Sequence, residues 1–479
     1  MNFKLKNKIS ITKFLNESSG KLLSPLTKQN YYITKVVTDT RTYKGKGGIF
    51  FAIKGKNFDG HNFINQIIDK IDFVVISDPN FVIENKKQKF IIVKDTILAL
   101  DTLAALYKNS FTKVKTIAVV GSNGKTTTKE LIKFVLSKKY NLTSTYENQN
   151  NLIGTAYTLF SINSKTEYCV LELGISLPGE MDILGKTTRP DCVVMTNIGK
   201  EHLEFLKTTE IVFQEEKKII NYLNPTGLLV LNKDDVYLKT IHWNENKRCY
   251  GIYNTTNNLD VYTEDIKFHP TYTEITVVVR DLLGLKFKLP VIKTKLTGIY
   301  NVYNILACIT CVYFFCIEDL NFISQTINEF EPVSMRGSRF ELNGNIIIDE
   351  SYNANPDSMQ ITISEFFKIF KDQQKVLVLG DMLELGEHTV GEHLKLKNYI
   401  DFDRINFLYL IGENMKVLYD SLPQKYKKIT KHYSDTISLF NDLKNLVLTN
   451  KGLYILFKSS HKIGLSEVVK NLQKVVQQL

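Results

Sequence analysis

VKTIAVVGSNGKTTT, residues 114–128, is the stretch that decides how this chain folds. Residues 114–120 form a β-prone apolar run, and the residues after it are typical of a turn that opens a helix, expected over residues 127–139. A strand, a glycine-rich loop and a helix in this order predict a phosphate-binding loop. Glycines let backbone N–H groups close around phosphate oxygens, and the helix N-terminus adds partial positive charge.

Two side chains of this loop could bind a nucleotide and its metal ion. Lys125 can reach the β- and γ-phosphate oxygens of a nucleotide, and the hydroxyl of Thr126 can ligate Mg²⁺. The general motif has glycine where this chain has Val119, so the loop is a variant of that motif. The residues expected to bind triphosphate are Gly121, Ser122, Asn123, Gly124, Lys125, Thr126 and Thr127.

Polar side chains also follow the two next predicted strands, residues 169–173 and 192–196. Glu172 stands at the end of the first of these strands, and His202 follows the second. Because the carboxyl ends of parallel strands meet at one edge of a sheet, both side chains are expected to face the phosphate loop. Glu172 could then complete a Mg²⁺ site with Thr126.

Alternation of apolar strands with helical patterns predicts the α/β class. A length of 479 residues suggests three domains at about 150 residues each. Short strands, among them residues 49–53, 73–76 and 90–93, fill residues 1–112. A mostly parallel sheet with helices on both faces is expected over 113–330, and a second alternating α/β block over 331–479.

Composition excludes several classes of protein. Lys plus Arg exceed Asp plus Glu by 61 to 50, but the lysines are spread along the chain without an Arg-rich cluster, so we expect no nucleic-acid partner. The longest apolar stretch, residues 306–317, is too short to span a membrane and predicts a buried helix. The six cysteines lack metal-site spacing and are read as reduced thiols of a cytoplasmic protein.

Taken together, the motifs resemble those of the Mur ligase family over nearly the whole chain. They are the phosphate loop, LELG at 171–174, NIGKEHLE at 197–204 and DESYNANP at 349–356. Residues 38–41, 49–55 and 58–61 resemble the UDP-sugar domain of the family, 145–154 its substrate loop, and 298–304 its adenine segment. DESYNANPDSM and GDMLELGE at 380–387 are most similar to the members that add D-Ala-D-Ala to UDP-N-acetylmuramoyl-tripeptide.

This resemblance implies three domains: a small UDP-sugar-binding domain, a P-loop ATPase domain and a C-terminal Rossmann-like domain. It also implies an ATP-dependent amide ligase of peptidoglycan precursor synthesis, expected to be a monomer. The tripeptide carboxylate would take the γ-phosphoryl group of ATP, and the amine of D-Ala-D-Ala would attack the acyl phosphate. The alternatives are a MurE-like ligase or a folylpolyglutamate synthetase-like enzyme.

The resemblance also assigns roles to residues. His202 would help to hold a second Mg²⁺, and Asn301 and Asn304 would lie near adenine. Of the two arginines before a predicted strand, Arg339 is favoured over Arg336 to reach phosphate or substrate carboxylate. Asp349, Tyr352 and Asn353 would close over the nucleotide. The expected substrate contacts are Thr40, Arg41, Lys54 and His61 at the uridine diphosphate end, with Asn148, Asn150 and Asn151 in the substrate loop.

At one position of the metal site the sequence departs from the family. Most Mur ligases have a carbamylated lysine on the helix after the HLE motif, and here its place falls on Glu216, with Lys217 one residue later. Adjacent helical residues point about 100° apart, so both cannot face the metal. Our hypothesis is that Glu216 supplies the carboxylate directly, and the alternative is a carbamylated Lys217.

A second departure lies near the C-terminus. Residues 458–461 read KSSH where relatives usually read KGSR, so His461 replaces an arginine. The charge of a histidine depends on its surroundings. The sequence therefore does not determine whether this position is positively charged, as it would be with arginine.

Overall fold

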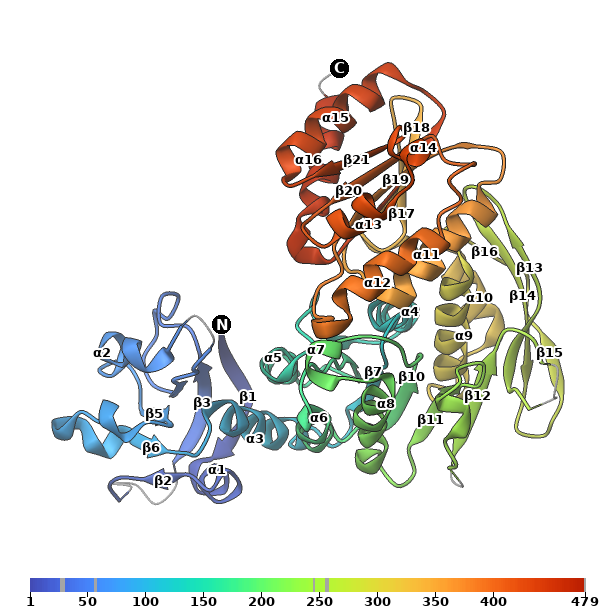
Figure 1. Ribbon diagram of the computed structural model, residues 1–479. Coiled ribbons are helices and arrows are strands. Elements are labelled where there is room, and N and C mark those ends of the chain that lie inside the picture. Colours follow the sequence, from blue (N-terminus) through green and yellow to red (C-terminus); the bar gives the residue numbers. More distant parts are fainter. Residues whose placement is uncertain (26–30, 56–57, 244–245, 255–257, 478–479) are drawn as a thin grey trace.

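The phosphate loop follows a strand at the centre of the largest sheet. The structure is a computed structural model that describes residues 1–25, 31–55, 58–243, 246–254 and 258–477. It has three α/β domains, each built around its own sheet, and the central domain lies between the other two (Figure 1).

The central sheet has the order β15-β14-β13-β12-β11-β10-β7-β9-β8, with β16 beside β14. It is parallel from β8 to β13, as predicted, and then continues with antiparallel strands, which the sequence analysis did not predict. The strands are β7 (Lys115–Val120), β8 (Leu142–Ser144), β9 (Tyr168–Glu172), β10 (Cys192–Met195), β11 (Leu228–Asn232), β12 (Lys247–Gly251), β13 (Val261–Phe268), β14 (Thr273–Arg280), β15 (Lys286–Lys288) and β16 (Ile292–Thr294). The helices are α4 (Lys125–Ser137), α5 (Leu152–Phe160), α6 (Glu180–Thr188), α7 (Leu203–Leu206), α8 (Thr209–Lys217), α9 (Ile299–Phe314) and α10 (Leu320–Asn328).

The N-terminal sheet has the order β1-β3-β4-β5-β6-β2. Its core of β3 to β6 is parallel, and β1 and β2 pair antiparallel at the two edges. The elements are β1 (Asn2–Ser10), α1 (Ile11–Ser18), β2 (Lys21–Leu22), β3 (Tyr32–Val37), β4 (Ile49–Phe51), α2 (Ile64–Ile67), β5 (Phe73–Ile76), β6 (Phe90–Ile92) and α3 (Thr96–Asn109).

The C-terminal sheet has the order β17-β18-β22-β19-β20-β21 and is parallel except at its edge strand β17. Helices α11 and α12 lie on the side of this domain that faces the central domain (Figure 1). The elements are β17 (Ser338–Leu342), β18 (Asn345–Glu350), α11 (Pro356–Ile369), β19 (Gln374–Gly380), α12 (Thr389–Lys395), β20 (Phe407–Ile411), α13 (Met415–Ser421), α14 (Gln424–Lys427), β21 (Thr430–Tyr433), α15 (Thr436–Thr449), β22 (Leu453–Lys458) and α16 (Leu465–Gln477).

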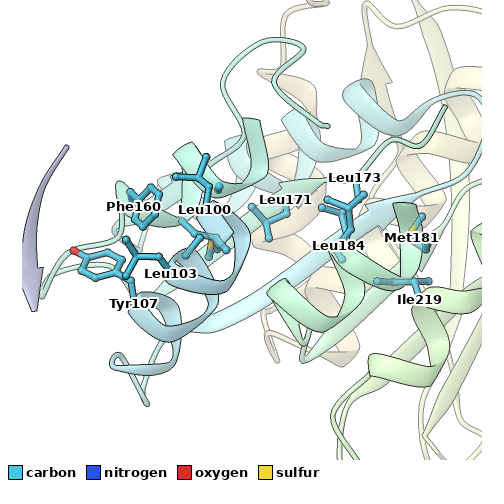
Figure 2. Close-up of a cluster of buried hydrophobic side chains, with 14 of the residues drawn as sticks. Leu100, Leu103, Tyr107, Phe160, Leu171, Leu173, Met181, Leu184 and Ile219 are labelled. Carbon is cyan, nitrogen blue, oxygen red and sulfur yellow. The ribbon is translucent and has the colours of Figure 1, made fainter. Parts of the chain in front are cut away.

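Helix α3 joins the N-terminal domain to the central domain through a shared apolar core (Figure 2). Leu100, Leu103 and Tyr107 on α3 are buried in the same cluster as Phe160 on α5 and Leu171 on β9. The hydroxyl of Tyr107 donates to the carbonyl of Ile162 over 2.7 Å. The predicted boundary at residue 112 therefore follows a helix that packs on the central domain.

Of the apolar stretch at 306–317, Leu306 to Val312 form a buried part of α9, as predicted, but the helix ends at Phe314 and Ile317 is exposed. None of the helices in the described ranges is both long and apolar enough to cross a membrane. All six cysteines are buried, and none of them forms a disulfide in the structure.

Candidate active site

A cavity of about 850 Å³ lies between the central and C-terminal domains. Its wall includes Lys125 and Thr126 from the phosphate loop, Glu172 from the end of β9, and Tyr352 and Asn353 from the C-terminal domain. Residues more than 200 positions apart thus meet around one space, and this space is the candidate active site.

The glycines of the phosphate loop are required by its geometry. Gly121 and Gly124 have φ of 115° and 83°, a region that side chains rarely adopt. A Cβ at Gly121 would lie 2.5 Å from the hydroxyl of Thr196, and one at Gly124 would overlap the amide of Asn304. Because α4 begins at Lys125, its free N–H groups open toward the cavity. The loop therefore has the form of an anion-binding turn.

Lys125 is folded back onto the loop and held by carboxylates. Its Nζ donates to the carbonyl of Gly121 and lies 3.3 Å from Oε2 of Glu201. Burial would lower the pKa of Lys125, but Glu201 and the nearby carboxylates of Glu216 and Glu172 raise it above its ordinary value. Lys125 is therefore a cation, ready to exchange a carboxylate partner for a phosphate.

Glu216 lies beneath the loop, whereas Lys217 points away from it. Oε2 of Glu216 accepts a hydrogen bond of 3.1 Å from the N–H of Gly121, and the side chain is fully buried. Burial raises its pKa to about 7, against the opposing charge of Lys125. Lys217 is exposed, with its Nζ 5.6 Å from the ring centroid of Phe213. The helix thus turns Glu216 toward the phosphate loop, and its role there stays a prediction.

The carboxylate of Glu172 and the hydroxyl of Thr126 offer the kind of ligand atoms that Mg²⁺ takes. Oε1 of Glu172 accepts from the amide of Asn150 over 2.7 Å, and its buried Oε2 has no hydrogen-bond partner among the described residues. Hard oxygens of this kind suit Mg²⁺. Within the described ranges no three His, Cys, Asp or Glu side chains could hold a metal together. The hydroxyl of Thr126 and ligand oxygens would therefore be needed to complete the site.

His202 also reaches the cavity, from a strained backbone position. Its φ is 50°, a left-handed value that is unusual for a residue with a side chain. Nδ1 lies 2.7 Å from Oε2 of Glu384, and Nε2 lies 4.0 Å from Oε2 of Glu201. Burial would lower the pKa of His202, but Glu384 and Glu201 raise it above the ordinary value.

The predicted substrate loop and adenine segment both line the same cavity. Asn151 caps α5 by accepting from the N–H of Gly154 over 2.9 Å, which fixes the loop that carries Asn148 and Asn150. At the start of α9, the amide of Asn304 donates to Oδ1 of Asn301 over 3.1 Å. Asn304 also accepts from the hydroxyl of Thr128 behind the phosphate loop.

In the C-terminal domain the two candidate arginines lie in different places, and only one of them lines the cavity. Arg336 lines the cavity, with its guanidinium 3.7 Å from the ring centroid of Tyr352. Arg339 lies outside the cavity and donates to the carbonyl of Pro270 and the hydroxyl of Thr297. Arg336 lies in the turn before β17, between Met335 and Gly337 with φ of 63° and 83°, whereas Arg339 lies on β17 itself. The turn places the two arginines in different surroundings, which their spacing in the sequence did not reveal.

Asp349 also lies apart from the cavity wall. Its Oδ1 accepts from the N–H and hydroxyl of Ser351, so it shapes the turn that presents Tyr352 and Asn353. His461, which replaces the usual arginine, is exposed beside Tyr352, with ring centroids 5.6 Å apart.

The four residues predicted for the uridine diphosphate end lie in the N-terminal domain and do not line the cavity. Arg41 pairs with Asp39 over 2.9 Å, and Lys54 lies 3.9 Å from Asp59. Thr40 donates to Gln66. His61 is buried and uses both ring nitrogens, with Nδ1 2.6 Å from Asp59 and Nε2 accepting from the N–H of Ser77. Its contacts are structural, whereas Arg41 and Lys54 are exposed.

Several residues of the site were missed by the sequence analysis. Glu201 pairs with Lys125 although only its neighbour His202 was singled out. Asn355 donates to Oδ1 of Asn123 over 2.9 Å, and Asp357 accepts from the N–H of Lys200 over 2.6 Å. Both contacts join the C-terminal domain to the phosphate-loop region, and only the position of Glu201 beside a strand end could have signalled such a role.

Comparison with known proteins identifies the family. The models of the Mur ligase middle domain and of the Mur ligase glutamate ligase domain match residues 119–312 and 336–461. The UDP-N-acetylmuramoyl-tripeptide–D-alanyl-D-alanine ligase of Bacillus subtilis (strain 168) is 32% identical, over 95% of this chain and 96% of that protein. The same ligase of Escherichia coli (strain K12) is 27% identical, over 97% of this chain and 99% of that protein.

Solved structures share the fold of this chain. MurF from Acinetobacter baumannii superimposes with a TM-score of 0.83 at 23% identity, covering 98% of this chain and 100% of that one. MurF ligase from Thermotoga maritima in complex with ADP gives 0.77 at 25% identity, covering 92% and 98%. The chain belongs to the Mur ligase family. Within that family it is a MurF-like, ATP-dependent ligase of peptidoglycan synthesis.

Proposed function

We propose that this protein joins D-Ala-D-Ala to UDP-N-acetylmuramoyl-tripeptide in the cytoplasm, releasing ADP and phosphate. The observation that carries the proposal is the convergence of the phosphate loop, the asparagine loop at 148–151 and the C-terminal turn at 352–353 on one cavity. This arrangement suits a reaction that must bring a triphosphate, a carboxylate and an amine together.

The first chemical demand is to bring two anions into contact. A tripeptide carboxylate and the γ-phosphate of ATP repel each other, so positive charge must lie between them. The N–H groups from Gly121 to Thr127 would hold the triphosphate, and Lys125 would turn from Glu201 toward the phosphate oxygens. Thr126 and Glu172 would hold Mg²⁺, which when bound would shield negative charge on the phosphates.

Glu216 would supply a carboxylate behind the phosphate loop, in the charged form that burial disfavours and Lys125 favours. Its free oxygen, Oε1, is buried and has no partner in the described ranges, and its other oxygen holds Gly121. A carboxylate in this place would orient the loop and balance the charge of Lys125 without a carbamate. This role rests on the orientation of α8 and applies to Glu216 rather than Lys217.

The acceptor would then extend from the cavity toward the N-terminal domain. Exposed Arg41 and Lys54, with Thr40 nearby, offer cationic and hydroxyl groups for a nucleoside diphosphate. Asn148 and Asn150 would bind the peptide end near Glu172, and Arg336 would bind a phosphate or carboxylate from the opposite wall. Asn301 and Asn304 would lie beside adenine. The amine of D-Ala-D-Ala would then attack the carbonyl carbon of the acyl phosphate, so that the C–N bond of the amide forms, the C–O bond to phosphate breaks, and inorganic phosphate and a proton leave.

The test is phosphate release measured with every combination of substrates. We expect release only with ATP, Mg²⁺, UDP-N-acetylmuramoyl-tripeptide and D-Ala-D-Ala together. Release with UDP-N-acetylmuramoyl-dipeptide and a single amino acid would instead indicate a MurE-like ligase. Release with folate and glutamate would indicate a folylpolyglutamate synthetase-like enzyme, and either result would overturn the proposal.

A further inference from the structure

A loop of the C-terminal domain, residues 383–388, packs against helix α7 of the central domain. The carbonyl of Glu384 accepts a 3.0 Å hydrogen bond from the N–H of Glu204, and the carbonyl of Lys207 lies 3.3 Å from Nε2 of His388. Gly386 approaches so closely that an added Cβ would lie 3.1 Å from Cα of Glu204. The loop and the helix therefore dock through backbone as well as side chains.

At the end of this contact, Glu384 meets His202. Their Oε2 and Nδ1 atoms lie 2.7 Å apart, across the interface between the two domains. Both residues have left-handed backbones, with φ of 62° for Glu384 and 50° for His202. Such conformations are costly for residues with side chains and persist where surrounding contacts hold them, often at functional sites. Here the two strained residues contact each other.

The pairing decides which nitrogen of His202 serves the cavity. A carboxylate at one ring nitrogen fixes the orientation of the ring and leaves the other nitrogen for the site. Since Glu384 occupies Nδ1, Nε2 faces Glu201, whose Oε2 lies 3.3 Å from Nζ of Lys125. A chain of contacts thus runs from the C-terminal domain through His202 and Glu201 to the phosphate loop.

We propose that Glu384 is a positioning residue for His202, supplied by the C-terminal domain. Its carboxylate contacts Nδ1 and keeps Nε2 turned toward Glu201 and Lys125, so the histidine is correctly oriented only when the C-terminal domain is docked. The proposal rests on the proposed function for its consequence in catalysis, but the pairing itself does not depend on the identity of the substrates.

The first test observes the pairing directly and uses no substrate. In the full chain with ¹⁵N-labelled histidine, a hydrogen-bonded imidazole proton gives a downfield NMR resonance, and His202→Ala assigns it. We expect Glu384→Ala to abolish this resonance. The matched control is Glu387→Ala in the same loop, whose carboxylate is 83% exposed and lies 4.0 Å from His388; it should leave the resonance in place. A resonance that survives Glu384→Ala unchanged would overturn the proposal.

The second test asks whether Glu384 acts through His202. With saturating substrates, Glu384→Ala should lower turnover about 10- to 100-fold, the range typical of residues that orient a ligand. Glu384→Gln should recover most of it, because an amide oxygen can still contact Nδ1. In a His202→Ala background, adding Glu384→Ala should change turnover by no more than about twofold.

Equal losses in both backgrounds, or a loss no larger than that of Glu387→Ala, would contradict the positioning role. These results are distinct from a failure of the proposed function. If the wild-type protein released no phosphate with UDP-N-acetylmuramoyl-tripeptide and D-Ala-D-Ala, that function would fall, and the NMR measurement would still decide the role of Glu384.

Discussion

Gly121 and Glu216 are joined by a 3.1 Å hydrogen bond from the backbone N–H of the first loop glycine to a fully buried carboxylate. The two residues are 95 positions apart, and the bond connects α8 to the turn that would hold the triphosphate. Burial raises the pKa of this carboxyl group to about 7, while Lys125 and the N–H of Gly121 favour its charged form.

This relationship predicts opposite outcomes for two neighbouring residues. Glu216→Ala removes the carboxylate from beneath the loop and should lower turnover at least tenfold, by analogy with groups that orient metal ligands. Lys217→Ala removes an exposed side chain and should leave turnover nearly unchanged. Both are measured as phosphate release at saturating substrates.

Removal of dissolved CO₂ gives an independent check on Glu216. A carbamate would be lost in CO₂-free buffer, whereas a glutamate would not, so we expect wild-type activity to be unchanged. Two results would refute the role of Glu216. One is loss of turnover in Lys217→Ala but not in Glu216→Ala. The other is loss of wild-type turnover in CO₂-free buffer that bicarbonate restores.

Substitution of the two arginines of the C-terminal domain should have different effects, one on ligand binding and the other on stability. Arg336 lines the cavity, so Arg336→Ala should raise KM for ATP or the UDP-linked acceptor without lowering the Tm. Arg339 ties the C-terminal domain to Pro270 and Thr297, so Arg339→Ala should reduce the free energy of unfolding by about 1–3 kcal/mol. Steady-state kinetics and thermal unfolding of both variants check this, and the reverse pattern would show that Arg339 is the ligand-binding residue.

The phosphate loop could be predicted from sequence because its chemistry is local. Strand β7, the glycines and Lys125 are consecutive, so their geometry follows from neighbouring residues. The parallel sheet likewise placed Glu172 at the edge that holds the loop. By contrast, Asn355 and Asp357 meet the loop region from another domain, and no local pattern specifies such packing.

Strands β13 to β16 were missed for a different reason. The regular βα alternation predicts a parallel sheet, and these strands continue it as antiparallel pairs without helices between them. The choice between Arg336 and Arg339 also depended on tertiary contacts, since both are arginines near the start of β17. The sequence could therefore predict the phosphate loop and Glu172 more readily than the residues that the C-terminal domain adds to the cavity.

Asp101 on α3 should make stability depend on pH. It is buried, and neither carboxylate oxygen has a hydrogen-bond partner in the described part of the chain. Burial raises its pKa well above the ordinary value. Since the folded state then holds a proton that the unfolded state releases, Asp101 costs stability as the pH rises above the unfolded pKa of about 4, by up to about 1.4 kcal/mol per pH unit.

Asp101→Asn removes this titration, so its gain in unfolding free energy over the wild type should grow as the pH rises above about 4. Urea unfolding at several pH values measures it, with Asp372→Asn as the control at an exposed aspartate. If this difference in unfolding free energy stays constant or shrinks as the pH rises, burial does not raise the pKa of Asp101 and the prediction is wrong.

The most direct test of the account is turnover of Lys125→Ala, because the whole mechanism requires a cation at this point of the phosphate loop. Lys133→Ala is the matched control, since Lys133 lies on the same helix with a side chain that is 42% exposed and pairs with Glu130. Amide formation is followed with ATP, UDP-N-acetylmuramoyl-tripeptide and D-Ala-D-Ala. We predict a loss of about 100-fold or more for Lys125→Ala and little change for Lys133→Ala; undiminished ligation by Lys125→Ala would contradict the account.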